Sequence, residues 1–224
     1  MNNTIQITAD GLLSNTHHPI QFIASPNCNE RPENSSITLL VIHNISLPPG
    51  NFNGNGVIEL FTNRLNPEAH PYYATLSGLK VSSHFFIRRD GEIIQFVACN
   101  QRAWHAGASN WLGKARCNDF SIGIELEGSD HTPFTTEQYN ALTDLTQCLC
   151  NHYPITDIVG HVHIAPERKT DPGPCFNWQA YATRIGDTAI LQMYNELPYV
   201  TLQTTMSQAI SHPADHLRDI KRKP

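Results

Sequence analysis

The run Ile37-Thr-Leu-Leu-Val-Ile-His-Asn-Ile45 limits the possible folds of this chain more than any other segment. Its apolar, largely β-branched side chains would face both sides of a strand. That pattern is typical of a strand in the middle of a sheet that is covered on both faces. His43 interrupts the run near its end, where a buried imidazole needs a polar partner. The run therefore predicts a central strand that ends in either a functional histidine or a hydrogen-bonded core histidine.

A second strand is predicted from Phe120-Ser-Ile-Gly-Ile-Glu-Leu-Glu127, which alternates strictly between apolar residues and small or acidic ones. One face would carry Phe120, Ile122, Ile124 and Leu126, and the other would carry Ser121, Gly123, Glu125 and Glu127. Because Ser121 and Gly123 are small, they would leave open space above the sheet beside Glu125. Glu125 is therefore a candidate catalytic carboxylate. The alternative is a solvent-facing glutamate on an edge strand.

Turn and cap signals predict the remaining elements. Residues 82–89 and 92–97 flank Arg-Asp-Gly and predict a hairpin, with Gly91 available for a positive φ. Residues 26–36 are expected to form a polar loop, and residues 57–63 a short helix.

Two longer helices are predicted in the second half of the chain. Thr135 or Thr136 can cap a helix that runs to about His152. Its buried side would carry Leu142, Leu145 and Leu149. Another helix should begin near Asn177 and carry Trp178 and Tyr181. The order of strands, hairpin, strand and helices predicts an α/β (α+β) fold: a single domain with a central mixed β-sheet covered by helices.

Composition restricts the possible partners and the location. With 224 residues, 40% hydrophobic residues and a net charge of −5, the chain is globular and unsuited to a broad nucleic-acid surface. No apolar run approaches the roughly 20 residues needed to cross a bilayer. Residues 1–10 have neither the basic nor the apolar part of a secretory signal. The six cysteines include no Cys-x-x-Cys pair. We therefore expect reduced thiols, a cytoplasmic location, and neither nucleic acid nor membrane as a partner.

Residues 160–173 crowd histidines, charges and prolines into one short segment. His161 and Asp171, ten positions apart, could both bind a metal if the loop between them folds back, which prolines and Gly173 would allow. Catalytic zinc sites use three protein ligands and keep a fourth position for water. The best candidate for a third ligand is His43, and His163 is the rival to His161.

Lys169 belongs to the same segment and could point into the same space. There its ammonium group would stabilise an oxyanion. The alternative is an ordinary surface lysine. A carboxylate such as Glu125 above that space could deprotonate a metal-bound water.

Four segments together resemble one family, the AmpD-type N-acetylmuramoyl-L-alanine amidases of bacterial cell-wall recycling. The resemblance covers about residues 12–185. The segments are Val41-Ile-His-Asn-Ile-Ser-Leu-Pro-Pro-Gly50, Arg102-Ala-Trp-His-Ala-Gly107, Cys117-Asn-Asp-Phe-Ser-Ile-Gly-Ile-Glu-Leu-Glu-Gly128 and Gly160-His-x-x-Ile-Ala-Pro-Glu-Arg-Lys-Thr-Asp-Pro-Gly-Pro174.

The resemblance implies a role for each residue of the expected site. His43, His161 and Asp171 would hold one zinc ion per chain, Glu125 would be the catalytic carboxylate, and Lys169 would support the oxyanion. It also implies the fold of peptidoglycan-recognition proteins and of a phage lysozyme-type amidase. The reaction would be hydrolysis of the amide between the lactyl group of (1,6-anhydro-)N-acetylmuramic acid and L-alanine in muropeptides.

Four further residues are expected to bind substrate. Asn44 and Trp104 would contact the sugar, although Trp104 is nearly as well explained as a core residue. Arg116 matches a family position that contacts the peptide carboxylate. Lys80 stands where the family pattern has arginine, so the bidentate fork is missing there. Three other histidines are expected around the ligands or in structural or surface positions: His84, His105 and His163.

Domain limits follow from the same resemblance. Residues 1–36 should pack on the domain as a strand and loop segment, and residues 37–185 should form the zinc amidase domain. Residues 186–224 are an extension without an assigned role. We expect a monomer that influences β-lactamase induction only through the level of its muropeptide substrate. The alternative from another class is a muropeptide-binding protein of the same fold without activity. A structural zinc domain fits poorly, because such sites are closed by four Cys or His ligands.

Overall fold

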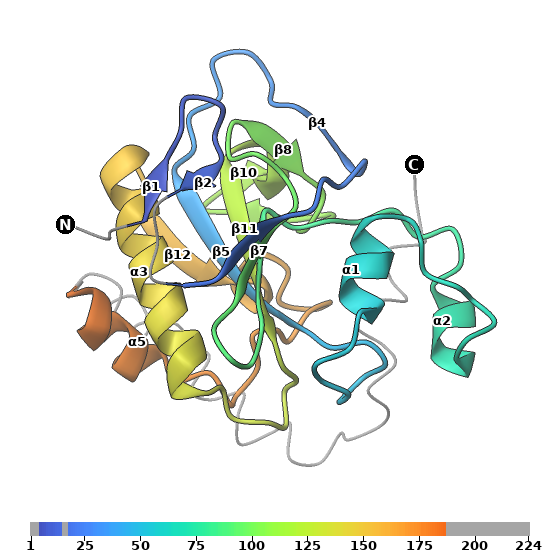
Figure 1. The fold of residues 1–224 in the computed structure, drawn as a ribbon. Coiled ribbons are helices and arrows are strands. Elements are labelled where there is room, and N and C mark those ends of the chain that lie inside the picture. The colour runs from blue at the N-terminus through green and yellow to red at the C-terminus, as the bar shows by residue number, and fades with distance from the viewer. Residues whose placement is uncertain (1–4, 15–17, 187–224) are drawn as a thin grey trace.

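A computed structural model describes residues 5–14 and 18–186 of the chain. Its centre is a six-stranded mixed sheet in the order β12-β5-β11-β6-β7-β3 (Figure 1). The strands are β3 (Ile20–Phe22), β5 (Leu39–Ile45), β6 (Phe85–Ile87), β7 (Ile93–Gln95), β11 (Ser121–Glu127) and β12 (Asp157–Gly160). The predicted single mixed sheet covered by helices is confirmed.

β5 and β11 lie side by side in the middle of this sheet and run parallel. Both predicted strands are therefore found, and β5 is buried along nearly its whole length. Because β11 has β5 on one side and β6 on the other, it has no free edge. The interpretation of Glu125 as a solvent-facing residue on an edge strand is wrong.

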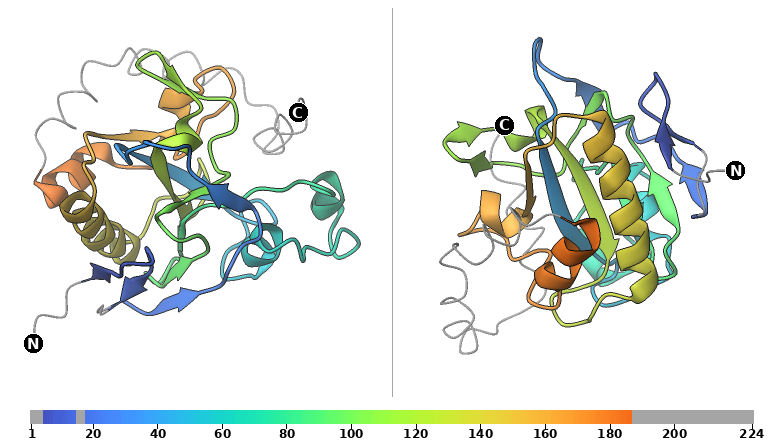
Figure 2. Two further views of the ribbon diagram at one scale, coloured as in Figure 1. Left: turned by 90° about the horizontal axis from the view of Figure 1, so that it is seen from above. Right: turned by 90° about the vertical axis from the view of Figure 1, so that its left-hand side faces the viewer.

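Helices α3 (Thr136–His152) and α5 (Trp178–Ile185) cover one face of the sheet (Figure 2). Leu142, Leu145 and Leu149 of α3 are buried there, as predicted. They pack with the apolar side chains of Leu40, Ile42, Ile122, Ile124, Leu126, Trp178 and Tyr181. Thr135 caps α3 in a complete capping box, since its hydroxyl accepts the Gln138 amide and Gln138 bonds back to Thr135.

A second apolar cluster lies around α1 (Gly56–Phe61) and includes Val57, Leu60 and Phe61. It packs against Phe86 and Ile94 of the hairpin β6–β7, the hairpin predicted around Gly91. Helix α2 (Pro71–Thr75) follows α1 and was not predicted.

Short elements form outside the sheet, where sequence patterns were weak. They are β1 (Gln6–Ile7), β2 (Leu13–Ser14), β4 (Cys28–Glu30), β8 (Gln101–Ala103), β9 (Asn110–Trp111), β10 (Lys114–Ala115), the 3₁₀ helix η1 (Cys117–Asp119) and α4 (His161–Ile164). β4 pairs with β8, so residues 26–36 are not wholly a loop as predicted.

Phe120 departs from the predicted alternation. It precedes β11 and packs with Leu39 and Val41, on the face opposite to Ile122 and Ile124. Along α3, Cys148 is buried and Cys150 is exposed, so these two thiols face different ways. All six cysteines are free.

The N-terminal segment is attached to the domain by both packing and pairing. Ile5 joins the main core, and β3 forms the edge of the sheet beside β7. The division at residue 36 stays a prediction. The expected extension lies outside the described residues apart from Gly186. Within the described ranges, no helix has the length and apolar character needed to cross a membrane.

Candidate active site

The side chains of His43, His161 and Asp171 meet at the carboxyl ends of two neighbouring parallel strands, β5 and β12. His43 lies near the end of β5, and His161 directly follows β12 as the first residue of α4. Asp171 returns from the loop after α4, where its carbonyl accepts the Val162 amide at 3.0 Å. The loop between the two predicted ligands therefore folds back.

Two glycines permit this return. Gly173 has a φ of +80° and donates its amide to Thr170 at 2.9 Å, which closes the turn around Asp171. Gly160 lies so close to the returning loop that an added Cβ would come within 2.6 Å of Pro172 Cδ. An added side chain would therefore collide with Pro172 at position 160 and with Asp130 at position 173.

Three buried ligand atoms form a compact triangle. His43 Nδ1 lies 3.0 Å from His161 Nδ1 and 2.8 Å from Asp171 Oδ2, and the third side is 3.1 Å. Tetrahedral zinc with bonds of 2.0–2.1 Å has ligand–ligand edges of about 3.3 Å. The triangle is therefore close to one face of such a tetrahedron.

A hydrogen bond on the side of the His161 ring that faces away from the triangle determines which ring nitrogen is protonated. His161 Nε2 lies 3.1 Å from the carbonyl oxygen of Ala106, which can only accept, so Nε2 carries the proton. Nδ1 of a neutral His161 is then a lone pair aimed at His43 and Asp171. A nitrogen lone pair and a carboxylate oxygen that converge in this way fit a cation, and the set of two histidines and one aspartate suits zinc.

The charge states of two of these residues agree with that fit. Burial, with the nearby His43, lowers the pKa of His161 to about 4 even though Asp171 opposes the shift. Burial alone would raise the pKa of Asp171, yet the imidazoles of His161 and His43 hold it well below its usual value. Near neutral pH, His161 is neutral and Asp171 is ionised, as metal ligands must be.

Glu125 lies beside the triangle, opposite His43 on the neighbouring strand. Its Oε1 is 4.0 Å from His43 Nδ1, and its buried Oε2 makes no hydrogen bond with any described residue. Burial raises the pKa of Glu125 to about 7, helped by Asp171 and opposed by His43 and Lys169. Such a carboxyl can both accept and return a proton at neutral pH.

Lys169 is buried, with 5% of its surface exposed, which excludes the ordinary surface lysine. Together with Glu125 and the ligand triangle it lines a cavity of about 300 Å³. A buried cation beside Glu125 can stabilise negative charge that develops in this cavity.

The open space expected above Ser121 and Gly123 is filled. The ring of His105 covers both residues, and a Cβ on Gly123 would lie 2.5 Å from its Cγ. His105 Nε2 is 3.1 Å from Ser121 Oγ, and His105 Nδ1 is 2.9 Å from His43 Nε2. Burial, followed by the neighbouring His43, holds the pKa of His105 well below its usual value. The prediction of free space was wrong, and the cavity begins beyond this ring.

Two of the four expected substrate residues, Asn44 and Trp104, line the cavity. The Asn44 amide donates to Asp130 Oδ1 at 2.8 Å and to the Pro172 carbonyl at 3.0 Å. Lys80 and Arg116 are exposed and lie outside the cavity lining. The two residues expected to contact the sugar therefore share a cavity with the candidate metal ligands, whereas the two expected to contact the peptide carboxylates do not.

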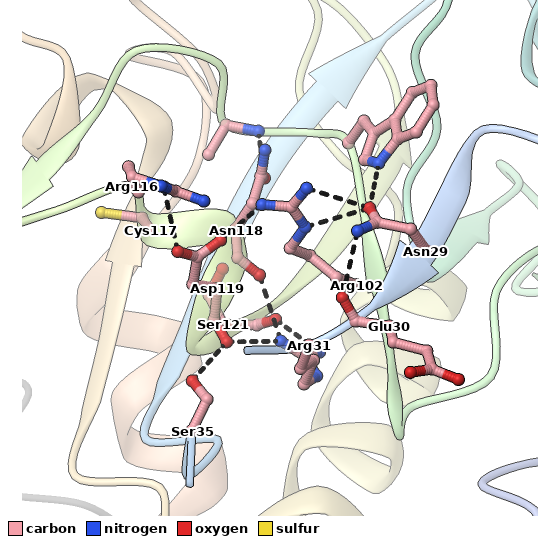
Figure 3. Close-up of polar contacts among 12 residues, drawn as sticks. Asn29, Glu30, Arg31, Ser35, Arg102, Arg116, Cys117, Asn118, Asp119 and Ser121 are labelled. Atoms are coloured by element: carbon pink, nitrogen blue, oxygen red, sulfur yellow. Dashed lines mark hydrogen bonds and ion pairs between the residues drawn. The ribbon is translucent and has the colours of Figure 1, made fainter. Parts of the chain in front are cut away.

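A polar network connects Trp104 with Arg116. Figure 3 shows its members Asn29, Arg102, Asp119 and Arg116. Asn29 Oδ1 accepts from Trp104 Nε1 at 2.8 Å and from the Arg102 guanidinium. Arg102 reaches Asp119 Oδ1 at 2.6 Å, and Asp119 Oδ2 pairs with Arg116 at 3.0 Å. Asn29, Arg102 and Asp119 were not predicted as site residues, since single charged or amide residues carry no periodic or motif signal.

His163 does not join the ligand group. Its Nδ1 accepts the Gly160 amide at 2.8 Å, and its ring lies 5.5 Å from the ring of Trp178. Among the described residues, the candidate metal-binding group comprises His43, His161 and Asp171.

Comparison with known proteins agrees with this geometry. The sequence profile of the family described as N-acetylmuramoyl-L-alanine amidase matches residues 33–174. A 1,6-anhydro-N-acetylmuramyl-L-alanine amidase AmpD from Enterobacter cloacae is 54% identical over 163 residues, which cover 72% of this chain and 87% of that protein. The AmpD of Escherichia coli K12 is 52% identical over 161 residues, covering 71% and 88%.

Solved structures give the same relationship. A crystal structure of an AmpD derivative matches with a TM-score of 0.76 and 48% identity, over 80% of this chain and 99% of that one. The amidase AmiD of E. coli, in complex with anhydro-N-acetylmuramic acid-L-Ala-D-γ-Glu-L-Lys, matches with a TM-score of 0.50 and 29% identity over 93% and 81%. A Drosophila peptidoglycan recognition protein at 16% identity shares the fold, with a TM-score of 0.50 over 71% and 91%. This chain therefore belongs to the N-acetylmuramoyl-L-alanine amidase family.

Proposed function

We propose that this protein hydrolyses the amide bond between the lactyl group of 1,6-anhydro-N-acetylmuramic acid and L-alanine in muropeptides, with one zinc ion per chain. The observation that carries the proposal is the convergence of His43, His161 and Asp171 beside the buried Glu125 in one cavity. The names of the AmpD relatives support the choice of substrate.

A zinc ion held by His43, His161 and Asp171 would supply Lewis acidity and lower the pKa of a water to about 7. Glu125 would take a proton from the attacking water as the lactyl carbonyl is attacked, and would then give it to the leaving alanine nitrogen. Lys169 stabilises the charge that develops on the carbonyl oxygen.

The cavity wall, together with two exposed cations outside it, would bind the substrate. Trp104 packs against the sugar, and Asn44 hydrogen-bonds it through its side-chain oxygen, since its NH₂ group donates to Asp130 and to the Pro172 carbonyl. Arg116 and Lys80 attract the free carboxylates of the peptide, with Lys80 as a point charge in place of a bidentate fork. These four assignments rest on the family resemblance, and the positions of Asn44 and Trp104 in the cavity wall support two of them.

The cellular setting follows from the same resemblance. We infer a monomer in the cytoplasm that takes part in peptidoglycan recycling, without nucleic-acid or membrane partners. By removing anhydromuramyl peptides it would lower the signal for β-lactamase induction.

The test is hydrolysis of an anhydromuramyl tripeptide by the full chain, followed by chromatography of the released peptide. Activity should disappear with a chelator and return with zinc. Glu125→Gln should lower kcat by about 10²–10⁴-fold while zinc binding is retained. Glu137→Gln, which changes an exposed carboxylate, is the matched control and should keep full activity. If the wild type binds zinc and the tripeptide but releases no peptide, the protein is a muropeptide binder and the amidase proposal is wrong.

A further inference from the structure

His105 contacts the metal-ligand group without being one of its ligands. It is buried, with 7% of its surface exposed, and stands between His43 of β5 and Ser121 of β11. The His43 and His105 rings meet edge to face, with centroids 5.0 Å apart. The three side chains form one hydrogen-bonded row, from His43 Nε2 through the His105 ring to Ser121 Oγ.

The row can be protonated in two directions. In the first, His43 Nε2–H donates to His105 Nδ1, and His105 Nε2–H donates to Ser121 Oγ. Nδ1 of His43 is then a lone pair directed at Asp171 and His161. In the second, every donor and acceptor is reversed, and His43 Nδ1 carries a proton. The protonated Nδ1 cannot bind a metal, so only the first direction is compatible with a metal centre.

We propose that His105 is the positioning residue of the metal centre: its Nδ1 accepts the Nε2–H of His43 and so holds His43 in the tautomer and ring orientation that present Nδ1 to the metal. The proposal rests on the metal site of the proposed function. It gives His105 the task that a carboxylate, carbonyl or water commonly performs behind a metal-bound histidine.

The surrounding structure holds His105 in place from two sides. Asn118 Oδ1 accepts the amide of His105 at 3.2 Å and that of Ala106 at 2.8 Å. Arg31 in turn fixes the backbone at Asn118 and Ser121, because its guanidinium donates to the carbonyl of Asn118 at 3.1 Å and to that of Ser121 at 2.9 Å (Figure 3).

On the opposite side, the ring lies against Gly123. A side chain there would displace it, since the added Cβ would lie 2.6 Å from His105 Nδ1, the atom that faces His43. The position of the acceptor atom is therefore fixed by the backbone of β11 as well as by the Asn118 amide.

The experiment compares zinc affinity in three variants, by competition with a chromophoric chelator. His105→Phe removes the acceptor and should lower zinc affinity by about 10–100-fold. His105→Asn restores an acceptor near the position of Nδ1 and should stay within about threefold of the wild type. His84→Phe is the control, because it also deletes a buried imidazole, and the His84 ring lies 5.8 Å from that of His105. It should reduce thermal stability without changing zinc affinity.

Unchanged zinc affinity in His105→Phe would overturn the proposal, and so would an equal loss in His84→Phe. A second measurement does not depend on any variant folding. In ¹⁵N NMR of the zinc-loaded wild type, the protonated nitrogens should be Nε2 of His43 and Nε2 of His105. A proton on His105 Nδ1 would refute the assigned direction.

These readouts need no substrate, so they separate the two proposals. If zinc affinity depends on His105 but the tripeptide is not cleaved, the amidase proposal fails and the role of His105 stands. If the wild type cleaves the tripeptide and His105→Phe binds zinc normally, only the role of His105 fails. A wild type that binds no zinc overturns both.

Discussion

Acid should destabilise this protein through His84, which is fully buried and neutral in the fold. Its Nδ1 accepts the Gly123 amide at 3.1 Å, and its Nε2 lies 3.1 Å from the Gln101 carbonyl. Burial lowers the pKa of His84 from 6.5 to about 3, and the cation of Arg31 acts in the same direction, while the Gln101 carbonyl opposes it. The folded protein therefore keeps His84 uncharged at pH values where the unfolded chain protonates it.

The size of the effect follows from this difference. As the pH falls from 7 to 5, the unfolded chain takes up a proton at His84 and the folded protein does not, so the free energy of unfolding falls. The loss from this residue is about 2 kcal/mol over that interval, and about 1.4 kcal/mol per pH unit from there to pH 4. The first figure depends almost entirely on the unfolded pKa of 6.5, since a folded pKa of about 3 leaves His84 unprotonated throughout the interval.

His84→Asn isolates this contribution, because Asn Oδ1 can accept the Gly123 amide but does not titrate. Urea unfolding of both proteins should be followed at several pH values in the same zinc-containing buffers. Other titrating groups and metal release then contribute nearly equally and cancel in the difference between the two proteins. The advantage of the wild type over the variant should shrink by about 2 kcal/mol between pH 7 and pH 5. A difference that stays constant within about 0.5 kcal/mol would refute the reasoning.

Three further changes have defined outcomes. Arg31→Leu removes a guanidinium that donates to four backbone carbonyls, and it should lower the free energy of unfolding in urea by about 3 kcal/mol. A loss below about 1 kcal/mol, as expected at an exposed arginine, would show that these hydrogen bonds do not stabilise the fold. Thr135→Ala removes the cap of α3 and should lower the free energy of unfolding in urea by about 1–2 kcal/mol. Thr136→Ala, at an exposed position, should change it little. Equal effects of the two variants would exclude the capping box as the cause. A thiol reagent at neutral pH should modify the exposed Cys150 and leave Cys99 unmodified, because Cys99 is buried and burial raises its pKa to about 12. Peptide mass spectrometry identifies the modified thiols, and modification of Cys99 in the folded protein would contradict this prediction.

The elements that could be predicted from the sequence are those determined by local periodicity and caps. β5 and β11 were visible because their apolar residues follow the strand period, and α3 because Thr135 and Gln138 stand at capping-box spacing before an apolar stripe. In these segments the local pattern and the tertiary burial agree.

The elements that were missed depend on contacts between distant segments. β4 forms because residues 28–30 pair with β8, over 70 positions further along the chain. α4 has four residues, too few for an apolar period, and is held by the return of the Asp171 loop onto Val162. Neither contact leaves a signal in the residues of the short segment itself.

The candidate site was predicted unevenly for a related reason. The spacing of the residues and the family motif together predicted that His43, His161 and Asp171 converge. The structure agrees, and both histidines lie at the carboxyl ends of apolar strands. The small residues Ser121 and Gly123 were correctly noticed but wrongly interpreted. A small residue indicates that something lies close to the backbone, and only the path of residues 104–106 across β11 identifies it as the His105 ring.

The two faces of the central sheet explain why the core could be predicted from the sequence more completely than the site. On the face under α3, Ile42, Ile122 and Ile124 are stabilised by burial, which is non-directional and tolerates many sequences with the same period. On the other face, the burial of His43 is offset by hydrogen bonds from specific partners: His105, His161 at the start of α4, and Asp171 in the loop after it. A period of two can therefore indicate which face is polar. The identity of the partners depends on loop geometry, and this is why the sequence could place His105 only among several possible positions, while its contacts with His43 and Ser121 required the structure.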